Sequence, residues 1–392
     1  QIIMENVSSS NGLEKYPKLR FPGFDEPYRV VTLGEISSMI KRSDPQSNAP
    51  VMMLSAGNGF IMQSDKYSRD NAGQSLKKYI LLKKGELAYN HGASKAKQFG
   101  CCYELQEEEA RIPYVYHCFK VCDTEYTPYV ALELNNPKMD KQLKRLVSSS
   151  VRMDGLLNIS YEEYMSVQVY LPAYSEQKRI ADFIEKLDER IAKQEQLIEA
   201  LKKYKRGVIT YIFSGKCNKF AAEATWTEKT LADLCCEFRS GRNISASLIT
   251  ETGEYAVYGG NGIRGYCDHY SHEGEYVVVG RQGALCGNVR LIQGKNYLSE
   301  HAIAVQANDE NDTKFLLFLL YFMKLGQYSD QGAQPGLAVN KLLKLKCTVP
   351  DKEIQSKIAS FLLNIDLQIS NHEKMLSFLV DQRKAFLQQL FI

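Results

Sequence analysis

The sequence predicts an α+β fold with two α/β domains separated by two long helices, which pair as an antiparallel coiled coil with a pseudo-two-fold internal repeat. Three observations support this prediction. The segment from Leu171 to Ile184 returns, altered but without a gap, from Val349 to Leu362, an offset of about 178 residues. Both copies carry apolar residues at heptad spacing, and a different, strand-rich sequence precedes each copy. The plan is therefore variable domain, helix, variable domain, helix.

The two long helices are predicted from their heptad stripes, which have the same phase in both copies. The stripe of the first copy contains Ile180, Ile184, Leu187, Ile191, either Leu197 or Ile198, and Leu201. The stripe of the second copy contains Ile358, Leu362, Ile365, Ile369 and Leu379. A heptad stripe requires a partner helix, and two stripes in one chain are able to bury each other. Ser175 after Pro172 predicts where the first helix begins, and Ser214-Gly215 predicts where it ends.

One polar residue occupies the same heptad position in each stripe, Gln194 in the first and His372 in the second. A lone polar residue in a coiled-coil core fixes the register at some cost in stability. The alternative is that both residues lie at the wet edge of the seam. We predict that they lie close together at the middle of an antiparallel pair.

The predicted boundaries divide the chain of 392 residues into five parts. These parts are a polar tail (1–16), a first domain (17–171), a central helix (172–216), a second domain (217–349) and a distal helix (350–392). No apolar run approaches the roughly 20 residues of a membrane span. The ten cysteines are scattered, and we expect a cytoplasmic protein with free thiols. His117, Cys118 and Cys122 lack the further ligand that a zinc site needs.

Short β-type runs and one helical stretch are predicted inside the domains. In the first domain, Tyr79–Leu82 and Leu87–Asn90 predict a hairpin. In the second domain, the predicted strands are Tyr255–Tyr258, Tyr276–Val279 and Asn288–Ile292, and the predicted helix is Lys314–Leu325. Both domains also open alike, because Tyr28 with Thr32-Leu33 recurs as Trp226 with Thr230-Leu231.

Polar residues in glycine-containing loops are the candidate ligand contacts. Residues 226–340 hold 9 Lys and Arg against 13 Asp and Glu, yet no lysine lies between Lys229 and Lys295, where every cation is an arginine. Glycine lets a backbone approach a ligand, and arginine can grip guanine at two acceptors. The candidates in the second domain are Arg239, Arg242, Asn261, Arg264, Arg281 and Gln282. Those in the first are Asn90, His91, Lys95 and Lys97. The alternative is that such residues are solvated beside ordinary turns.

No motif for covalent chemistry is found. The chain has no glycine-rich phosphate loop followed by Lys-Ser/Thr, and Asn135-Asn136-Pro137-Lys138 lacks the aromatic residue that amino-methyltransferases place against a flipped base. Glu176-Gln177-Lys178 resembles half of a nuclease motif, but we interpret it as helix capping and surface charge. We therefore predict a protein that is not an enzyme and binds no cofactor or metal itself.

Several of these segments together carry a family resemblance. Pro17-Lys-Leu-Arg-Phe-Pro-Gly-Phe24, Leu33-Gly-Glu-Ile36, the repeated Leu-Pro…Glu-Gln-Lys-Arg-Ile-Ala block, Tyr258-Gly-Gly-Asn-Gly262 and Gly280-Arg-Gln-Gly283 resemble the DNA specificity subunit of type I restriction-modification systems. The resemblance covers nearly all of the chain from Pro17 to Ile392, and its most specific part is the duplicated helix block.

The resemblance implies a function as well as a fold. In that family each variable domain, a target-recognition domain, reads one half of a split double-stranded DNA target. The two helices act as a spacer and dock two methyltransferase subunits. These partners are similar to adenine-N6 methyltransferases that use S-adenosylmethionine, and an ATP- and Mg-dependent motor and nuclease subunit joins them. Ile354 departs from the pattern, since the family and the first copy have Glu there, and this predicts unequal docking surfaces. The competing hypothesis is a coiled-coil scaffold whose two β-rich heads bind protein or glycan.

Overall fold

The computed structural model describes residues 5–6, 16–66, 73–95, 97–147, 157–215, 225–283, 285–330 and 336–392. The chain forms two compact units. The first unit combines Gln1–Lys193 with Leu376–Ile392, and the second unit is Gln194–Met375. None of the helices in the described ranges is long and apolar enough to cross a membrane.

The first unit is built mainly from short strands. They are β1 (Glu5–Asn6), β2 (Leu19–Arg20), β3 (Arg29–Thr32), β4 (Ser37–Met39), β5 (Met52–Ser55), β6 (Gly59–Met62), β7 (Ile80–Lys83), β8 (Leu87–Asn90), β9 (Cys101–Glu104), β10 (Glu109–Ile112), β11 (His117–Val121) and β12 (Gln168–Leu171). Strands β4, β11, β8 and β9 form a four-stranded antiparallel sheet in that order. The remaining strands pair in twos as β1–β2, β3–β12, β5–β6 and β7–β10.

The hairpin predicted from Tyr79–Leu82 and Leu87–Asn90 is wrong. Strand β7 pairs with β10, whereas β8 pairs with β9 and β11. The turn between them contains Gly85 at φ 82°. The Glu86 carboxylate accepts from the backbone N–H of Lys83 at 2.7 Å and from Arg42 at 2.6 Å. These bonds occupy the end of β7, and the chain passes from one sheet to another there.

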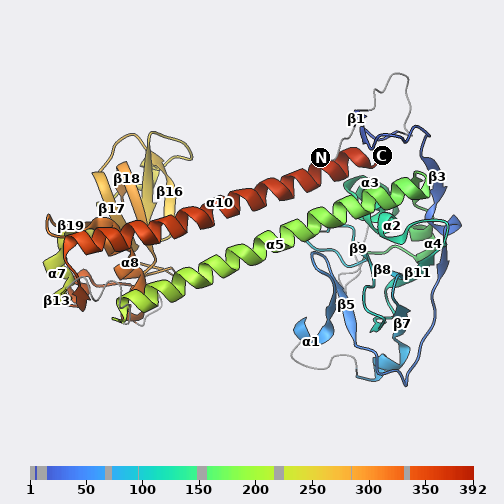
Figure 1. Cartoon of the computed structure of the whole chain (residues 1–392), viewed down its shortest axis with the longest axis horizontal. Coiled ribbons are helices and arrows are strands. Elements are labelled where there is room, and N and C mark those ends of the chain that lie inside the picture. The colour runs from blue at the N-terminus through green and yellow to red at the C-terminus, as the bar shows by residue number, and fades with distance from the viewer. Residues whose placement is uncertain are drawn as a thin grey trace. The chain divides into compact units, whose positions relative to one another are not determined.

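Helices α2 (Thr127–Leu134), α3 (Pro137–Leu146) and α4 (Tyr161–Met165) of the first unit share one core with its four-stranded sheet. Helix α1 (Gln63–Lys66) lies away from these helices (Figure 1) and contacts β6. The 3₁₀ turns of this unit are Leu33–Glu35 and Gly73–Lys78. One core joins buried residues of β8 and β11 to α2 and to the beginning of the first long helix. Leu390 and Phe391 belong to this core, and both are fully buried.

The second unit contains a six-stranded sheet with the order β14-β19-β17-β18-β15-β16. Only β15–β18 is a parallel pair in this sheet. The strands of the unit are β13 (Thr227–Thr230), β14 (Cys235–Ser240), β15 (Tyr255–Gly259), β16 (Gly262–Cys267), β17 (His272–Gly280), β18 (Val289–Leu298), β19 (Ala302–Ala307) and β20 (Lys346–Val349). The three strands predicted from sequence are confirmed as parts of β15, β17 and β18.

Short helices complete the second unit. They are α7 (Leu231–Leu234), α8 (Thr313–Phe322), α9 (Val339–Leu342) and the 3₁₀ turns Ala246–Leu248 and Leu325–Tyr328. Helix α8 packs against β17, β18 and β19. It confirms the predicted helical stretch, and Asp312 caps its beginning by accepting from the N–H of Phe315. The core of this unit joins α8 to Val277, Val279, Ile303 and Val305 of the sheet.

Both domain openings are the same structure, as their similar sequences predict. Strands β3 and β12 pair antiparallel in the first unit, and β13 and β20 pair antiparallel in the second. Each leading strand ends in a capping box, Thr32 with Glu35 and Thr230 with Asp233. Because β12 and β20 lead directly into the long helices, each opening strand lies beside the entry to its helix.

The long helices are α5 (Tyr174–Phe213) and α10 (Lys352–Leu390). The observed limits of α5 confirm the predicted start and end. Within the first unit, Phe183 stacks edge-on with Phe386 and Asp188 bonds to Arg383. Within the second unit, Lys202 pairs with Glu373 and Lys205 with Asp366. In both units the residue numbers on one helix rise as those on the other fall, so the two helices are antiparallel.

The heptad stripes make two kinds of contact: with the core of a unit near the beginning of each helix, and with the other helix further along. Ile180 and Ile184 are fully buried in the core of the first unit, and Ile358 and Leu362 are fully buried in that of the second. Among the other stripe positions, four are buried and two are half-buried. The buried ones are Leu187, Ile365, Ile369 and Leu379, and the half-buried ones are Ile191 and Leu201. Ile198 is buried at 4% exposure and Leu197 is 40% exposed, so Ile198 occupies the position that the sequence left open.

Gln194 and His372 contact each other, as predicted. The Gln194 amide nitrogen lies 2.9 Å from Nδ1 of His372 and donates to the His372 carbonyl at 2.9 Å. Both side chains are half-buried. The pair therefore combines the two alternatives, because it is at the edge of the seam and still makes a bond that one register alone allows.

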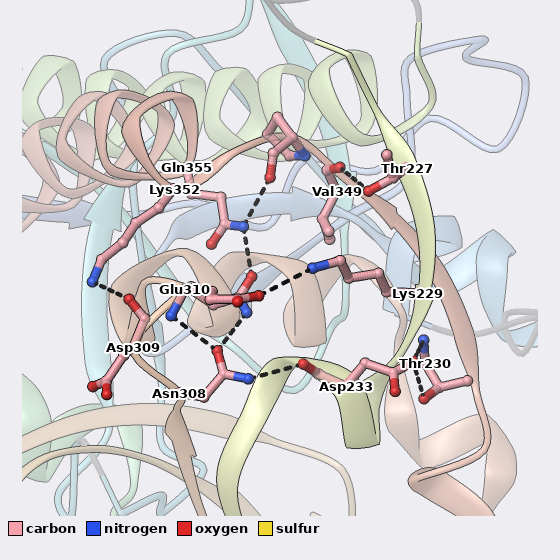
Figure 2. A network of polar contacts seen from close by, with 12 residues as sticks. Thr227, Lys229, Thr230, Asp233, Asn308, Asp309, Glu310, Val349, Lys352 and Gln355 are labelled. Carbon is pink, nitrogen blue, oxygen red and sulfur yellow. Dashed lines mark hydrogen bonds and ion pairs between the residues drawn. The ribbon is translucent and has the colours of Figure 1, made fainter.

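A buried glutamine ties the start of α10 to the second unit. The Gln355 amide donates to the Pro350 carbonyl at 2.9 Å and to the side chain of Asn311 at 2.8 Å, and its oxygen accepts from the N–H of Asp312 at 3.0 Å. Figure 2 shows Gln355 above a wider network in which Lys352 bonds to the Asp309 carbonyl. The glutamine therefore connects the helix entry with the beginning of α8.

The first unit contains the same device at the equivalent residue. The Gln177 amide donates to the Pro172 carbonyl at 2.9 Å and to Glu125 at 2.7 Å, and its oxygen accepts from the N–H of Tyr126 at 2.8 Å. Tyr126 precedes α2 as Asp312 precedes α8. Gln177 and Gln355 are 0% and 1% exposed, so the interpretation of Glu176-Gln177-Lys178 as surface charge is wrong for Gln177.

That interpretation is wrong for Glu176 as well. Its carboxylate is fully buried and accepts from Nε and Nη2 of Arg20 at 2.9 and 2.8 Å. Ile354, at the equivalent place in α10, is also buried, at 4% exposure. Neither residue belongs to an accessible surface, so the expectation that Ile354 makes the docking surfaces unequal is wrong at this position.

Candidate nucleic-acid interface

Four connections of the second unit lie at one end of the six-stranded sheet. They are the segments 240–242 after β14, 260–261 between β15 and β16, 281–283 after β17, and 299–301 between β18 and β19. Backbone bonds tie the first three to the fourth or to its flanks: Arg242 N to Leu298 O (2.8 Å), Ser299 N to Tyr258 O (2.9 Å) and Arg281 N to His301 O (2.9 Å). The sheet therefore brings together loops that are up to about 60 residues apart in the sequence.

Close packing of these loops requires glycine at two positions. A Cβ atom on Gly241 would lie 2.2 Å from the Leu298 carbonyl oxygen. A Cβ atom on Gly260 would lie 2.6 Å from the Gln282 carbonyl oxygen. Both distances are far below van der Waals contact and both involve backbone atoms, so any side chain there would separate the loops. These glycines thus allow the loops to pack together, whereas the sequence interpretation had assigned them to the approach of a ligand.

The predicted side chains of these loops are mostly accessible. Arg242, Asn261, Arg264 and Gln282 are exposed. Arg281 is half-buried and donates from Nη1 to the Glu300 carbonyl at 3.3 Å. The structure therefore places five of the six predicted residues of this domain in one loop cluster.

One arginine of this cluster was missed by the sequence argument. Arg290 is exposed on β18, and its guanidinium lies 3.4–3.6 Å from where a Cβ of Gly262 would stand. Arg264 packs its side chain against Gly259 in the same way. Since Gly259 and Gly262 are paired across β15 and β16, both arginines flank one turn. The sequence signal was glycine near arginine along the chain, whereas the glycine beside Arg290 belongs to another strand.

The charges of this cluster are not neutralised internally. Within the described ranges, Arg242, Arg264, Arg281 and Arg290 have no ion pair with a carboxylate. Residues 226–340 are acidic as a whole, with 9 Lys and Arg against 13 Asp and Glu, and four of those nine cations lie at this end of the sheet. Such a concentration of unpaired guanidinium groups can attract an anion despite the unfavourable overall charge.

Arg239 does not join the loop cluster. It lies on β14, where its Nε donates to Glu237 at 2.8 Å. His272 and Tyr276 also bond to Glu237. Burial opposes ionisation of Glu237, but the bond from Arg239 and the nearby His272 lower its pKa overall. Arg239 thus has an internal partner, which contradicts its expected place among the reading residues.

The first unit uses two of its four predicted contact residues internally. His91 is buried, and its ring nitrogens lie 2.8 Å from the Leu157 carbonyl oxygen and 3.0 Å from the Val115 carbonyl oxygen. Lys97 is half-buried and donates to the Asn135 carbonyl at 2.9 Å, and burial lowers its pKa. Both placements contradict the expectation of groove-facing side chains.

The two remaining residues differ in accessibility. Lys95 is exposed, and Asn90 is half-buried with its side-chain oxygen accepting from the N–H of Gly92 at 2.9 Å. Asn90 therefore shapes the turn that carries Lys95. The candidate surface of the first unit retains these two residues, whereas that of the second unit forms a cluster.

No metal centre is found in the part of the chain that the structure describes. No group of three or more His, Cys, Asp and Glu is arranged there to hold an ion. His117 bonds through Nε2 to the Ile159 carbonyl and stacks on His91 with ring centroids 5.0 Å apart. Burial lowers its pKa. Cys118 is buried, and both it and Cys122 are free thiols.

The loop cluster lies in a segment with recognisable relatives. Residues 223–377 match the family model of the type I restriction modification DNA specificity domain. The chain is also 44% identical over 148 residues to the specificity subunit of the type I restriction enzyme EcoprrI from Escherichia coli. This part of the chain therefore resembles a type I specificity subunit. The aligned segment covers 37% of this chain and 37% of the relative's own length.

Two solved structures share the fold over nearly the whole chain. The S subunit of a type I restriction-modification system from M. genitalium covers 96% of this chain and 99% of its own, with a TM-score of 0.65 at 18% identity. A second chain, from work on complex assembly and conformational transition of a type I system, covers 94% and 98% with a TM-score of 0.56 at 15% identity. The expected α+β fold is therefore confirmed, because the chain shares it with these two solved structures.

Proposed function

We propose that the chain is the non-catalytic DNA-reading subunit of a type I restriction-modification enzyme, with one half of a bipartite double-stranded target read by each domain. The observation that carries this proposal is the loop cluster of the second unit. It presents Arg242, Asn261, Arg264, Arg281 and Arg290 at one end of a sheet, with Gln282 beside them, inside the segment that matches the DNA specificity domain. Arginine suits guanine, and Asn or Gln suits adenine. Most polar contacts of such a surface go to phosphate and fix its position on the duplex.

We further propose that the long helices dock two adenine-N6 methyltransferase subunits, and through them the motor and nuclease subunit. S-adenosylmethionine would then belong to the methyltransferase, and ATP and Mg to the motor subunit, in a complex acting in the cytoplasm. Three exposed apolar residues of α5 support docking, Leu197, Tyr204 and Tyr211, at intervals of seven residues along one helix face. Since these three residues lie outside the intrachain seam, their stripe is suited to a further helix.

Methylome sequencing tests the reading function directly. Cells that express this chain with a cognate methyltransferase should carry N6-methyladenine in a two-part motif with an unread gap. Arg281→Ala should relax only one part of that motif and weaken cognate binding by about 1–3 kcal/mol. Lys95→Ala should weaken binding evenly over sequences, because a phosphate contact carries no sequence information. A motif unchanged by Arg281→Ala, or changed in the other half, contradicts the assignment of this surface.

The scaffold alternative makes a different prediction. Heads that bind protein or glycan would show neither duplex-sequence preference nor the steep loss of DNA affinity with salt that counterion release produces. A binding series between about 50 and 200 mM salt, with cognate and shuffled duplexes, separates the two functions. The docking proposal is tested by Tyr204→Asp, which should abolish co-purification of the methyltransferase. Lys203→Asp serves as the control, because Lys203 is also exposed but is not part of the apolar stripe.

A further inference from the structure

One side chain of the loop cluster is held by its neighbours. The Gln282 side-chain oxygen lies 2.7 Å from Nδ1 of His301. The other ring nitrogen of His301 lies 2.9 Å from a carboxylate oxygen of Glu300. The three side chains therefore form a chain of contacts, Glu300 to His301 to Gln282. It spans the connection after β17 and the connection between β18 and β19.

The backbone around this chain is fixed. The N–H of Arg281 donates to the His301 carbonyl at 2.9 Å, and Nη1 of Arg281 donates to the Glu300 carbonyl at 3.3 Å. A Cβ on Gly260 would lie 3.3 Å from the His301 carbonyl oxygen, so a third loop packs against the same residue. His301 consequently has little freedom to move its backbone, although its side chain is 40% exposed.

The chemistry of the chain determines which atom Gln282 presents outward. The Glu300 carboxylate lies against Nε2, on the far side of the ring from Gln282, and restrains the orientation of the imidazole. The amide of Gln282 has one acceptor end and one donor end. Its oxygen is the atom that faces Nδ1 of His301, so a hydrogen bond there is donated by Nδ1, and the NH₂ group of Gln282 stays outside this contact. A free amide donor fits the acceptors of a base edge, such as N7 or O6 of guanine or N7 of adenine.

We propose that His301 is a positioning residue for sequence readout, holding the Gln282 amide with its donor end toward the DNA. The inference rests on the proposed DNA-reading function of the second unit. His301 acts through Gln282 and is not itself a base contact. Glu300 supports it by holding the far side of the ring. The sequence argument missed both residues, because neither lies beside a glycine.

Selection of duplexes from a random pool by the full-length chain in its methyltransferase complex tests this inference. His301→Phe keeps a ring of similar size but removes both nitrogen contacts. It should reduce the preference at one base pair of one half-site about three- to tenfold, the effect of one hydrogen bond, and leave every other position unchanged. His301→Asn should restore the preference, since its amide can still donate from near the place of Nδ1. Glu300→Gln should give a partial loss at the same base pair.

The Gln282→Ala background separates positioning from general loop damage. If His301 acts through Gln282, adding His301→Phe to Gln282→Ala should change the selected motif no further. His269→Phe is the matched control, because His269 is an exposed histidine of the same unit that pairs with Asp268. An unchanged thermal unfolding transition shows that a variant is folded. If His301→Phe does not fold, Glu300→Gln is combined with Gln282→Ala in the same double-mutant test.

The outcomes distinguish the two proposals. A wild-type complex that selects no sequence overturns the DNA-reading function itself. A wild-type motif that is retained at all positions in His301→Phe, or that changes at several positions or additively with Gln282→Ala, overturns the role of His301 alone. A loss confined to the position that Gln282→Ala also relaxes supports it.

Discussion

The two units hold the beginnings of their long helices in chemically different ways. In the first unit, Glu176 is buried with Arg20 in a two-bond ion pair. In the second, Ile354 takes the same helix position and packs with Ile358 in an apolar core. The helices, their partner strands and the adjoining glutamines are otherwise alike. A duplicated fold can therefore exchange a buried ion pair for an aliphatic side chain at an equivalent position, provided that the charged residue keeps its partner.

A second contrast of the same kind lies one element away. Helices α2 and α8 both begin directly after the residue whose N–H donates to the buried glutamine, Gln177 or Gln355. When the two helices are aligned at Thr127 and Thr313, Glu133 of α2 is equivalent to Leu319 of α8. Both side chains are buried, at 3% and 2% exposure. The first unit thus contains ionisable groups where the second is apolar. The stability of the first unit should depend on pH more strongly than that of the second.

The largest expected effect is the loss of one partner of the buried ion pair. Glu176→Ala leaves the Arg20 guanidinium buried without its carboxylate and should lower the free energy of unfolding by about 3–5 kcal/mol. Hydrogen exchange read by mass spectrometry should show the loss of protection within the first unit. The double variant Arg20→Met with Glu176→Ile, which copies the second unit, should recover most of the stability. Failure of the double variant to recover would show that the two anchors are not interchangeable.

The buried glutamines Gln177 and Gln355 should contribute comparable amounts to the free energy of unfolding of their units. Gln355→Ala removes three hydrogen bonds and leaves the N–H of Asp312 unsatisfied, so we expect a loss of about 2–3 kcal/mol. Gln177→Ala should cost at least as much, because it also strips a bond from the buried carboxylate of Glu125. Urea unfolding at neutral pH measures both. A loss in one unit only would contradict their structural equivalence.

Glu133 should give the first unit a distinctive pH dependence. Burial raises the pKa of Glu133 to about 8. A raised folded-state pKa means that stability is fully present below the ordinary value, near 4.5, and is lost as the pH rises toward and through about 8. Glu133→Gln should therefore be more stable than wild type at pH 8, by about 4 kcal/mol, and within about 1 kcal/mol of it at pH 5. Unfolding curves at both pH values check this, and Leu319→Ala serves as a control whose effect should not vary with pH.

The smallest effect is expected at the seam. Gln194→Leu removes the bond to the half-buried His372 and should change the free energy of unfolding by at most about 1 kcal/mol. Together with His372→Leu it should stabilise the helix pair but weaken the choice of register. Cysteine cross-linking between α5 and α10 at matched and shifted positions measures the register. A single cross-linked register in the double variant would show that the apolar positions alone define it.

Periodic features of this chain could be predicted from the sequence, whereas contacts between distant segments could not. The heptad spacing predicts both helices, their antiparallel pairing and the Gln194–His372 contact, because each depends on a local repeat. His91 and Lys97 looked like loop residues, yet their partners are carbonyls of Leu157 and Asn135, 66 and 38 residues further along the chain. Glu176 has its partner Arg20 at a separation of 156 residues. Five residues of the loop cluster were predicted from their position near glycines in the sequence. Arg290 and His301 were missed, because their neighbours in the cluster come from other strands and loops.

The burial of Leu390 and Phe391 in the first unit has a consequence during synthesis. The carbonyl of Leu390 accepts from the Tyr28 hydroxyl, that of Phe391 accepts from Lys138, and the Phe391 ring stacks on Tyr129. All residues of the second unit, Gln194–Met375, leave the ribosome before these two. The domain made first is therefore completed last, and it must wait with part of its core open while the second unit is translated and folds. Premature termination beyond Met375 would spare the second domain and disable the first.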